Sequence, residues 1–499
     1  MASNSIFAPL RAMSVTTALV ISVCVVDSVT IAYDGSLMGS LNVLDSYINY
    51  FNINTTTKAV NSAATYIGAV LIAPFAGKLI DSRGRKAGIL ISALLNILGA
   101  VLGAAAQNIA MFIAGRMIVG MGAGLAMTSA GTYVGETTSP AVRSFALGLY
   151  FTCWALGSFL AAGFTYGCAK LEPSTWAWRA PTLLQALCPI FIFVVLFFVP
   201  ESPRWLAYND RREEALDVLA RINNVTAQDV GVQVQYQEII DTMEYEKADG
   251  RKMGFREIVR TAPNRKRLFL ALSIGPLTML TGSNVITYYF GDMLSQAGIT
   301  NSTTQLEINL ILSAWQFVVG LTGSLLAERI GRRMLCLVSL GSCTAFFYLL
   351  GGLTARYGTS SDTSGIYGTV ACIFLFLGGY SFGLTPLTNM YGPEVLSYNI
   401  RGTGMAMFSV SSKVCGIFVT MVFPYMFDSI GWKTYMVNAS WNVLFWVFVY
   451  FYWVETKGRT LEEIDELFDG EKHSDVPDLS VVKDKHDLEI NVEEVSRTM

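Results

Sequence analysis

The segment Gly77-Lys-Leu-Ile-Asp-Ser-Arg-Gly-Arg-Lys86 returns later in the chain as Gly323-Ser-Leu-Leu-Ala-Glu-Arg-Ile-Gly-Arg-Arg333. Each copy holds a glycine, an apolar pair, an acid, an arginine, a second glycine and further basic residues. A solvated basic turn would explain the positive charge, but it would not explain the repeated acid and glycines. The repeat therefore predicts a chain built from two homologous halves.

Composition indicates a membrane protein. Of the 499 residues, 52% are hydrophobic and only 15% are charged, whereas soluble proteins carry about 25% charged residues. Continuous apolar runs of about 20 residues, the length that crosses a bilayer as a helix, recur along the chain. We therefore expect an all-α membrane protein of 12 transmembrane helices near 14–36, 60–80, 87–107, 110–132, 145–167, 180–199, 267–295, 305–327, 334–354, 366–390, 403–428 and 434–454.

The basic residues set the expected topology. They gather in both copies of the repeat and in the polar segment between the halves, so the positive-inside rule places these segments and both termini in the cytoplasm. The sequons at Asn54 and Asn301 fall on the opposite side and are candidates for glycosylation. The expected parts are a cytoplasmic N-terminus over 1–13, a six-helix bundle over 14–199, a cytoplasmic helical linker over 200–266, a second six-helix bundle over 267–454 and a largely disordered cytoplasmic tail over 455–499.

Several functional classes lack support in the sequence. The net charge is −3 and the basic residues are scattered, so no nucleic-acid partner is expected. The eight cysteines form no CxxC pair, which disfavours a disulfide framework or a metal site. The only histidines are His473 and His486, both in the tail, and the chain holds no nucleotide-binding loop. We predict no catalytic residue, no metal and no cofactor, and expect neither an enzyme nor an ATP-driven pump.

An ordered set of short motifs carries a family resemblance. Beyond the repeats, the motifs are Gly115-Arg116, Tyr133-Val-Gly-Glu136, Pro200-Glu-Ser-Pro-Arg-Trp205, Gly392-Pro-Glu394 and Val454-Glu-Thr-Lys-Gly-Arg459. The set resembles the sugar porter branch of the major facilitator superfamily, especially fungal hexose and lactose permeases, over nearly the whole chain. The resemblance implies two pseudosymmetric six-helix bundles in the plasma membrane. It also implies a cytoplasmic gate formed by Asp81, Arg83, Arg85, Glu136, Arg143, Glu328, Arg332, Glu394 and Arg401.

Ionisable residues inside the predicted spans are candidates for ion coupling. The first span contains Asp27 and Asp34, and the fourth begins with Arg116. Such residues are costly in a membrane and are by default functional candidates. Proton-coupled sugar porters carry an acid and an arginine at the positions of Asp34 and Arg116, so the resemblance implies proton symport. The alternative places Asp34 in a solvated position near the outer interface. Asp27 lies two helical turns earlier on the same face and is a second candidate.

The solute site departs from the family pattern. Sugar recognition needs amides, hydroxyls and aromatic faces. The seventh span has Thr278-Met279 where the family has two glutamines, although Asn284 agrees with it. Several amide donors are missing, which predicts altered selectivity because a site discriminates against ligands that leave its polar groups unpaired. The predicted solute-binding residues are Asn284, Tyr288, Tyr289, Gln316, Asn389, Thr278, Thr152, Ser412 and Lys413.

Lys413 has three interpretations. It lies well inside the predicted span 403–428, where a charge is expected to face the interior or to pair with an acid. In one interpretation it is a partner for Asp27 or Asp34, and in another it contacts a carboxylate-bearing or otherwise anionic solute. In the third, the span begins later and Lys413 lies at the membrane interface.

Together these features predict a secondary active transporter for a sugar or sugar-like solute. A small polar solute, a proton and the lipid bilayer are its expected partners, and a monomer is expected. An alternative keeps the fold and changes the solute to an organic acid or a specialised metabolite, including export. A third alternative is a non-transporting nutrient receptor. Such receptors generally have long signalling tails, whereas the tail here spans only 455–499.

Overall fold

The computed structural model describes residues 14–138, 142, 146, 149–150, 153–248, 258–358, 360, 362–396, 398–457 and 467–468. All regular secondary structure in these ranges is helical. Two predicted site residues, Arg143 and Thr152, lie outside the described residues. For three others, Glu328, Asn389 and Arg401, the backbone is described and the side chain is not.

The first half contains the helices expected for spans one to six. A short helix that the sequence analysis did not predict, α3 (Asp45–Phe51), follows the first of them. The sixth span is divided into two helices at Gln185–Ala186. The helices at the span positions of this half are α2 (Val15–Leu41), α4 (Thr55–Arg83), α5 (Arg85–Ala104), α6 (Ile109–Thr137), α8 (Trp154–Ala169), α9 (Trp176–Leu184) and α10 (Leu187–Val195).

Three short helices join the halves, and six further spans follow. The linker helices are α11 (Pro203–Tyr208), α12 (Arg212–Asn223) and α13 (Val230–Ala248), which share a small apolar core of their own. The seventh span is divided into α15 (Ala262–Met279) and α16 (Ser283–Gln296). The remaining helices are α17 (Ser302–Ile330), α18 (Arg332–Tyr357), α19 (Thr363–Val395), α20 (Tyr398–Ile430) and α21 (Lys433–Tyr452).

Ten of the described helical segments are long and apolar enough to cross a membrane. Two of them are the paired segments α9–α10 and α15–α16. Among the helices at predicted span positions, α8 and α21 are outside this set; they occupy the fifth and twelfth positions, and α8 has 16 residues. The order of the helices follows the order of the predicted spans.

The two halves repeat the same packing pattern. In the first half α5 packs on α6, α6 on α4, and α2 on α8. In the second half the corresponding contacts join α18 to α19, α19 to α17, and α15 to α20. Gly120 explains one close approach, because a Cβ atom there would clash with the carbonyl oxygen of Thr65 on α4. Small residues let transmembrane helices approach in this way.

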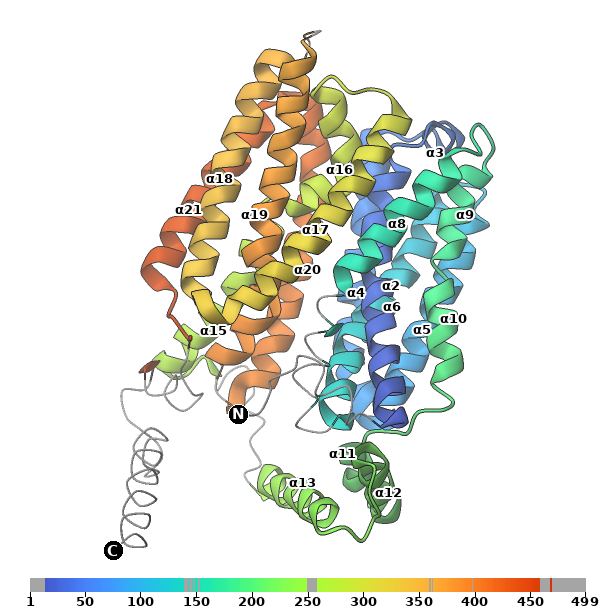
Figure 1. The fold of residues 1–499 in the computed structure, drawn as a ribbon, viewed down its shortest axis with the longest axis vertical. Coiled ribbons are helices and arrows are strands. Elements are labelled where there is room, and N and C mark those ends of the chain that lie inside the picture. The colour runs from blue at the N-terminus through green and yellow to red at the C-terminus, as the bar shows by residue number, and fades with distance from the viewer. Residues whose placement is uncertain are drawn as a thin grey trace, which may run out of the picture.

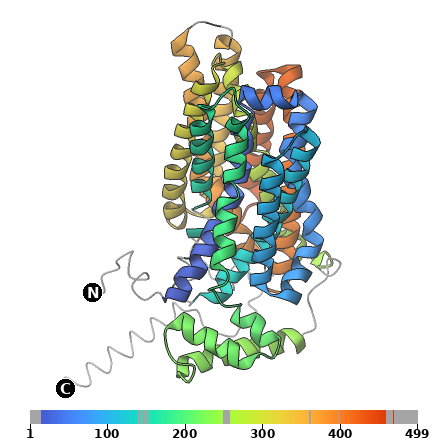
Figure 2. The ribbon, with the colours of Figure 1, turned by 90° about the vertical axis from the view of Figure 1, so that its right-hand side faces the viewer.

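The halves lie side by side and are joined by three helix pairs. These pairs are α2 with α16, α4 with α20, and α8 with α17. Both ribbon views show the linker helices α11–α13 at one end of the bundles, here called the linker end (Figures 1 and 2). The end that carries α3 is here called the far end (Figure 1).

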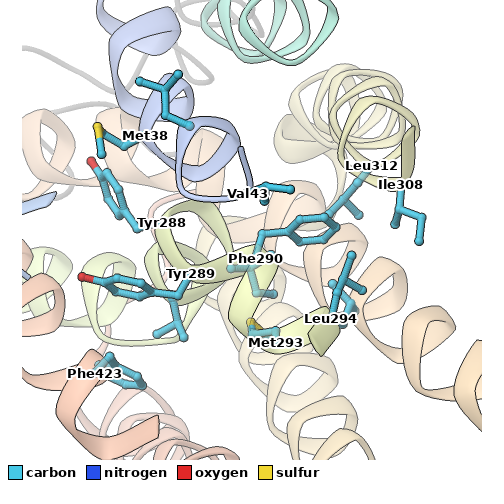
Figure 3. Packing of buried hydrophobic residues seen from close by; sticks show 14 of the residues in the cluster. Met38, Val43, Tyr288, Tyr289, Phe290, Met293, Leu294, Ile308, Leu312 and Phe423 are labelled. Carbon is cyan, nitrogen blue, oxygen red and sulfur yellow. The ribbon is translucent and has the colours of Figure 1, made fainter. Parts of the chain in front are cut away.

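Apolar side chains from both halves seal the far part of this interface. Met38 of α2 and Val43, in the turn after α2, face Tyr288 and Phe290 of α16 (Figure 3). Leu312 of α17 belongs to the same buried cluster. At Gly39 a Cβ atom would clash with the Thr287 carbonyl of α16, so glycine allows the two helices to touch.

Candidate coupling and solute site

A buried ion pair lies inside the first half. Asp34 and Arg116 are each 4% exposed, and the Arg116 Nη1 atom donates to the Asp34 carboxylate and to its backbone oxygen. Gln185, at the break between α9 and α10, donates to the same carboxylate oxygen at 2.9 Å. The Nε and Nη2 atoms of Arg116 are buried without a partner among the described residues. The pair is therefore shielded from solvent by the bundle, and two guanidinium nitrogen atoms remain available as donors.

Asp27 is also buried but does not belong to this pair. It is 1% exposed, and its Oδ2 atom has no hydrogen-bond partner among the described residues. It lies near the middle of α2 (Val15–Leu41), far from both ends of the helix. The chain thus places a second carboxyl group deep in the first half, with an oxygen left unpaired.

The seventh span is broken where it faces the first half. Gly282, between α15 and α16, has a φ of 120°, and a Cβ atom there would clash with the Phe347 ring. The carbonyl groups of Leu280 and Thr281, in the turn between α15 and α16, accept hydrogen bonds from side chains of α21. Asn438 and Trp441 donate to the Leu280 oxygen at 3.1 and 2.8 Å, and Asn442 donates to the Thr281 oxygen at 2.9 Å.

Asn284 lies in the first turn of α16, just after this break, and faces Tyr66 of the first half. The Tyr66 hydroxyl donates to the Asn284 Oδ1 atom at 3.4 Å, and the Tyr66 and Tyr288 rings lie 6.1 Å apart. The Lys413 Nζ atom lies 5.8 Å from the centre of the Tyr66 ring and 3.6 Å from the Met127 sulfur. These four residues, Tyr66, Asn284, Tyr288 and Lys413, are here called the interface cluster. Tyr66 was not among the residues predicted from the sequence, because it carries no charge that would set it apart in the second span.

Of the other predicted solute-binding residues, Thr278 and Tyr289 donate to backbone carbonyl groups, whereas the buried Ser412 hydroxyl has no partner among the described residues. The Thr278 hydroxyl donates to the Ile274 carbonyl of its own helix, and the Tyr289 hydroxyl donates to the Thr420 carbonyl. Ser412 is buried where α20 approaches Gly275 of α15. Gln316 is half-buried on α17.

The two sequence repeats form matching networks at the linker end. In the first half the Arg85 Nε atom lies 2.9 Å from Glu136, and Glu201 accepts from the backbone amides of Arg85 and Lys86 at 3.0 and 3.1 Å. In the second half Arg332 lies 2.7 Å from Glu394, and Glu455 accepts from the amides of Arg332 and Arg333 at 2.8 and 3.1 Å. Gly84 and Gly331 begin the two helices with φ values of 98° and 102°.

Each network joins helices of one half. Ser202 donates to Glu136, and Thr456 donates to Glu394 at 2.6 Å. Asp81 is exposed and lies 3.7 Å from Arg85. Arg83, which the sequence grouped with Arg85, is exposed beside this network. Burial raises the pKa of Glu201 above its ordinary value, although the amide hydrogen bonds from Ser202, Lys86 and Arg85 oppose that shift.

Polar contacts between the halves gather at the far end. Lys58 of α4 bonds to both carboxylate oxygens of Asp292 of α16 at 2.6 Å. Further contacts there join Tyr166 to Glu307 at 3.0 Å, Ser40 to Asn309 at 2.9 Å, Thr56 to Tyr425 at 3.0 Å and Thr55 to Asp428. The far ends of the halves are therefore tied together, whereas the ion pairs of the linker-end networks stay within one half.

Solved structures share this arrangement. The inward-open xylose transporter XylE from E. coli is similar to this chain with a TM-score of 0.75 at 19% identity, covering 91% of this chain and 100% of that one. The partially occluded inward-open structure of the same transporter has a TM-score of 0.73 at 19% identity, covering 90% of this chain and 100% of that one. Two pseudosymmetric bundles with this order of helices define a membrane protein with the 12-helix major facilitator fold.

Residues 20–468 match the family model described as "Sugar (and other) transporter", and the chain belongs to that family. An MFS-type transporter, criB, from Aspergillus cristatus is 30% identical, covering 88% of this chain and 90% of its own. A high-affinity glucose transporter from Kluyveromyces lactis is 28% identical, with coverage of 91% and 86%. A quinate permease from Emericella nidulans is 29% identical, with coverage of 89% and 86%. The family consists of transporters, and its members have several solutes.

Proposed function

We propose that this protein carries a sugar or sugar-like solute across the plasma membrane by alternating access, together with a proton moving in the same direction. The buried pair of Asp34 and Arg116 carries the proposal. The buried Asp34 carboxyl group lies beside a guanidinium that has unpaired donors. When Arg116 pairs with Asp34, it stabilises the negatively charged carboxylate and favours release of a proton. When Arg116 moves away, the buried carboxylate is left without a counter-charge and favours binding of a proton. Gln185 fixes the orientation of the carboxylate.

The solute site is proposed at the interface cluster, where α4 and α20 meet beside the broken seventh span. Discontinuous transmembrane helices commonly build solute sites near the midplane between two repeats. Here the amide of Asn284, the hydroxyl of Tyr66 and the aromatic rings offer the groups that bind hydroxyls and the apolar face of a ring.

The linker end is proposed to face the cytoplasm, with both termini on that side. In that orientation the far-end contacts close the outer gate, and the structure is the inward-facing state of a monomeric carrier. The linker-end networks around Arg85 and Arg332 would then belong to the inner gate. The sequons at Asn54 and Asn301, both exposed at the starts of α4 and α17, would face outside and are proposed glycosylation sites.

Transport in liposomes tests this function. Purified full-length protein is reconstituted, and uptake of labelled glucose, xylose and quinate is followed with and without an inward proton gradient. The expected result is accumulation above equilibrium of at least one solute, driven by the gradient and abolished by a protonophore. Uptake that ignores the gradient would remove proton coupling, and a failure to move any tested solute would count against transport itself.

A further inference from the structure

Lys413 is a positive charge near the middle of the long helix α20 (Tyr398–Ile430). At about 1.5 Å per residue, either end of the helix is more than ~20 Å away along the axis. The extended lysine side chain does not span that distance, so Lys413 lies inside the membrane-spanning part of the chain.

The side chain of Lys413 points across the interface to the first half. Its ammonium group lies beside the Met127 sulfur of α6 and over the Tyr66 ring of α4. Neither neighbour carries a charge, and within the described ranges no ion pair includes Lys413. Asp34, an acid of α2 that the sequence offered as a partner, is already paired with Arg116.

Lys413 is half-buried, and no carboxylate partner is recorded for it in the described ranges. Its ammonium loses part of its hydration in the bundle, and a weak, solvent-accessible sulfur contact and a cation–π contact replace only some of it. Burying a charge is tolerated where the group pairs with an opposite charge. A carboxylate that arrives with the solute supplies that charge and explains why the position holds a lysine.

The groups beside Lys413 complete a recognition surface for such a solute. Tyr66 links the ammonium to Asn284, since its ring faces Lys413 and its hydroxyl bonds to the Asn284 amide. Tyr288 adds an aromatic edge. A positive charge, a hydroxyl, an amide and two rings within one cluster match a ring that bears several hydroxyls and one carboxylate.

We propose that Lys413 binds the carboxylate of the transported solute, and that the solute is a polyhydroxylated carboxylic acid. This inference rests on the proposed transport function and narrows its solute class. Lys413 is thus a specificity residue: with its charge removed, the same cleft retains the groups that bind neutral hydroxylated rings and loses its preference for the anion.

Ligand-induced thermal stabilisation of purified full-length protein tests the inference directly. Quinate serves as the hydroxylated carboxylate, and myo-inositol serves as a neutral hydroxylated six-membered ring. A ligand that binds only the folded protein raises the melting temperature, and the rise grows with the logarithm of ligand concentration above the Kd, so a concentration series yields the affinity. The variants are Lys413→Met and Lys413→Arg. Lys433→Met is the matched control, because Lys433 is exposed at the start of α21.

The expected result is that quinate stabilises both wild type and Lys433→Met. Both proteins should bind quinate with an affinity at least ~10-fold higher than that of Lys413→Met. Lys413→Arg keeps the charge and retains part of that affinity, which also shows that the position tolerates substitution. The affinity for myo-inositol changes little across the series. The same order is expected for quinate counterflow in liposomes.

Two kinds of result overturn the inference: those that leave the transport proposal standing and one that removes it as well. If glucose or myo-inositol binds and is transported while quinate does neither, or if Lys413→Met leaves quinate affinity unchanged, Lys413 does not select a carboxylate and the transport proposal stands. If wild-type protein transports neither the neutral nor the anionic solutes, the proposed function fails together with the inference.

Discussion

Lys58 and Asp292 face each other across the two halves at the far end, and the Lys58 ammonium lies 2.6 Å from each carboxylate oxygen of Asp292. The side chains are 17% and 34% exposed, so the pair is partly screened by solvent. Because one residue belongs to α4 and the other to α16, the pair forms only when the far ends are together. Under the proposed alternating access, this pair is a contact of one transport state.

Removing this charge pair is expected to favour opening at the far end. Exposed ion pairs contribute about 0.2–1 kcal/mol, so Lys58→Met should change the ratio of closed to open states by roughly 5-fold at most. Amide hydrogen exchange in the first turn of α4 and the last turn of α16 measures the change. The exchanged pair Lys58→Asp with Asp292→Lys should restore protection, and Lys433→Met should not alter it. Equal exchange in wild type and Lys58→Met would contradict this role.

The proposed coupling pair makes a second prediction. Asp34→Asn keeps the shape of the side chain and its contact with Gln185 but cannot exchange a proton. Proton-driven accumulation of solute should be lost, while solute counterflow, which needs no net proton movement, should persist. Uptake with and without a pH gradient, compared with counterflow in the same liposomes, measures both. If Asp27→Asn abolishes accumulation and Asp34→Asn does not, the coupling residue is Asp27 instead.

The fold was predictable because the bilayer demands long apolar helices, and because the duplicated segments at Gly77 and Gly323 mark two halves. The sequence analysis did not predict α3 or the division of the sixth and seventh spans. The apolar run continues through the break in the seventh span, so hydropathy does not reveal it. The carbonyl groups of Leu280 and Thr281 at the break are bound by side chains from α21, the last helix of the second bundle. Only three-dimensional packing identifies partners so distant in the sequence.

The candidate site was predictable in part. Asp34 and Arg116 stood out because charges are rare inside spans, and the structure brings them together. Gln185 and Tyr66 carry no charge, so nothing in the pattern separated them from other polar residues of their spans. The motif also gave no means to separate Arg83 from Arg85, since both are basic. In the structure the Arg85 side chain reaches Glu136, and Arg83 is exposed.

Glu201, which accepts hydrogen bonds from the backbone amides at the start of α5, is expected to make the stability of the protein depend on pH. Its pKa is raised by burial, so the folded protein binds a proton at Glu201 more tightly than the unfolded chain does. The contribution of such a group to stability is largest below its unfolded-state pKa and is lost as pH rises through the folded-state value. Glu201→Gln cannot titrate. The melting temperature of wild type minus that of Glu201→Gln should therefore increase as pH falls from about 8 to about 5.

A matched control keeps this measurement specific to Glu201. Glu213 is exposed on α12, and Glu213→Gln removes one carboxyl group that accepts none of the amide hydrogen bonds at Glu201. The difference between wild type and Glu201→Gln should change more with pH than the difference between wild type and Glu213→Gln. A constant difference for Glu201→Gln would show that burial does not perturb Glu201.

The broken seventh span makes the last prediction, through Asn442 on α21. Asn442 is 0% exposed and donates to the Thr281 carbonyl at 2.9 Å. Asn442→Leu keeps a side chain of similar volume but leaves that buried carbonyl without this donor, which should cost about 1–3 kcal/mol. Trp441→Phe also removes one donor to the break, but the Leu280 carbonyl keeps its bond from Asn438, so its cost should be smaller. Unfolding of both variants in detergent, followed by heat and by denaturant, measures the order. If Trp441→Phe were the more damaging change, the carbonyl groups at the break would not be what α21 stabilises, and the support for Asn284 at the start of α16 would come from elsewhere.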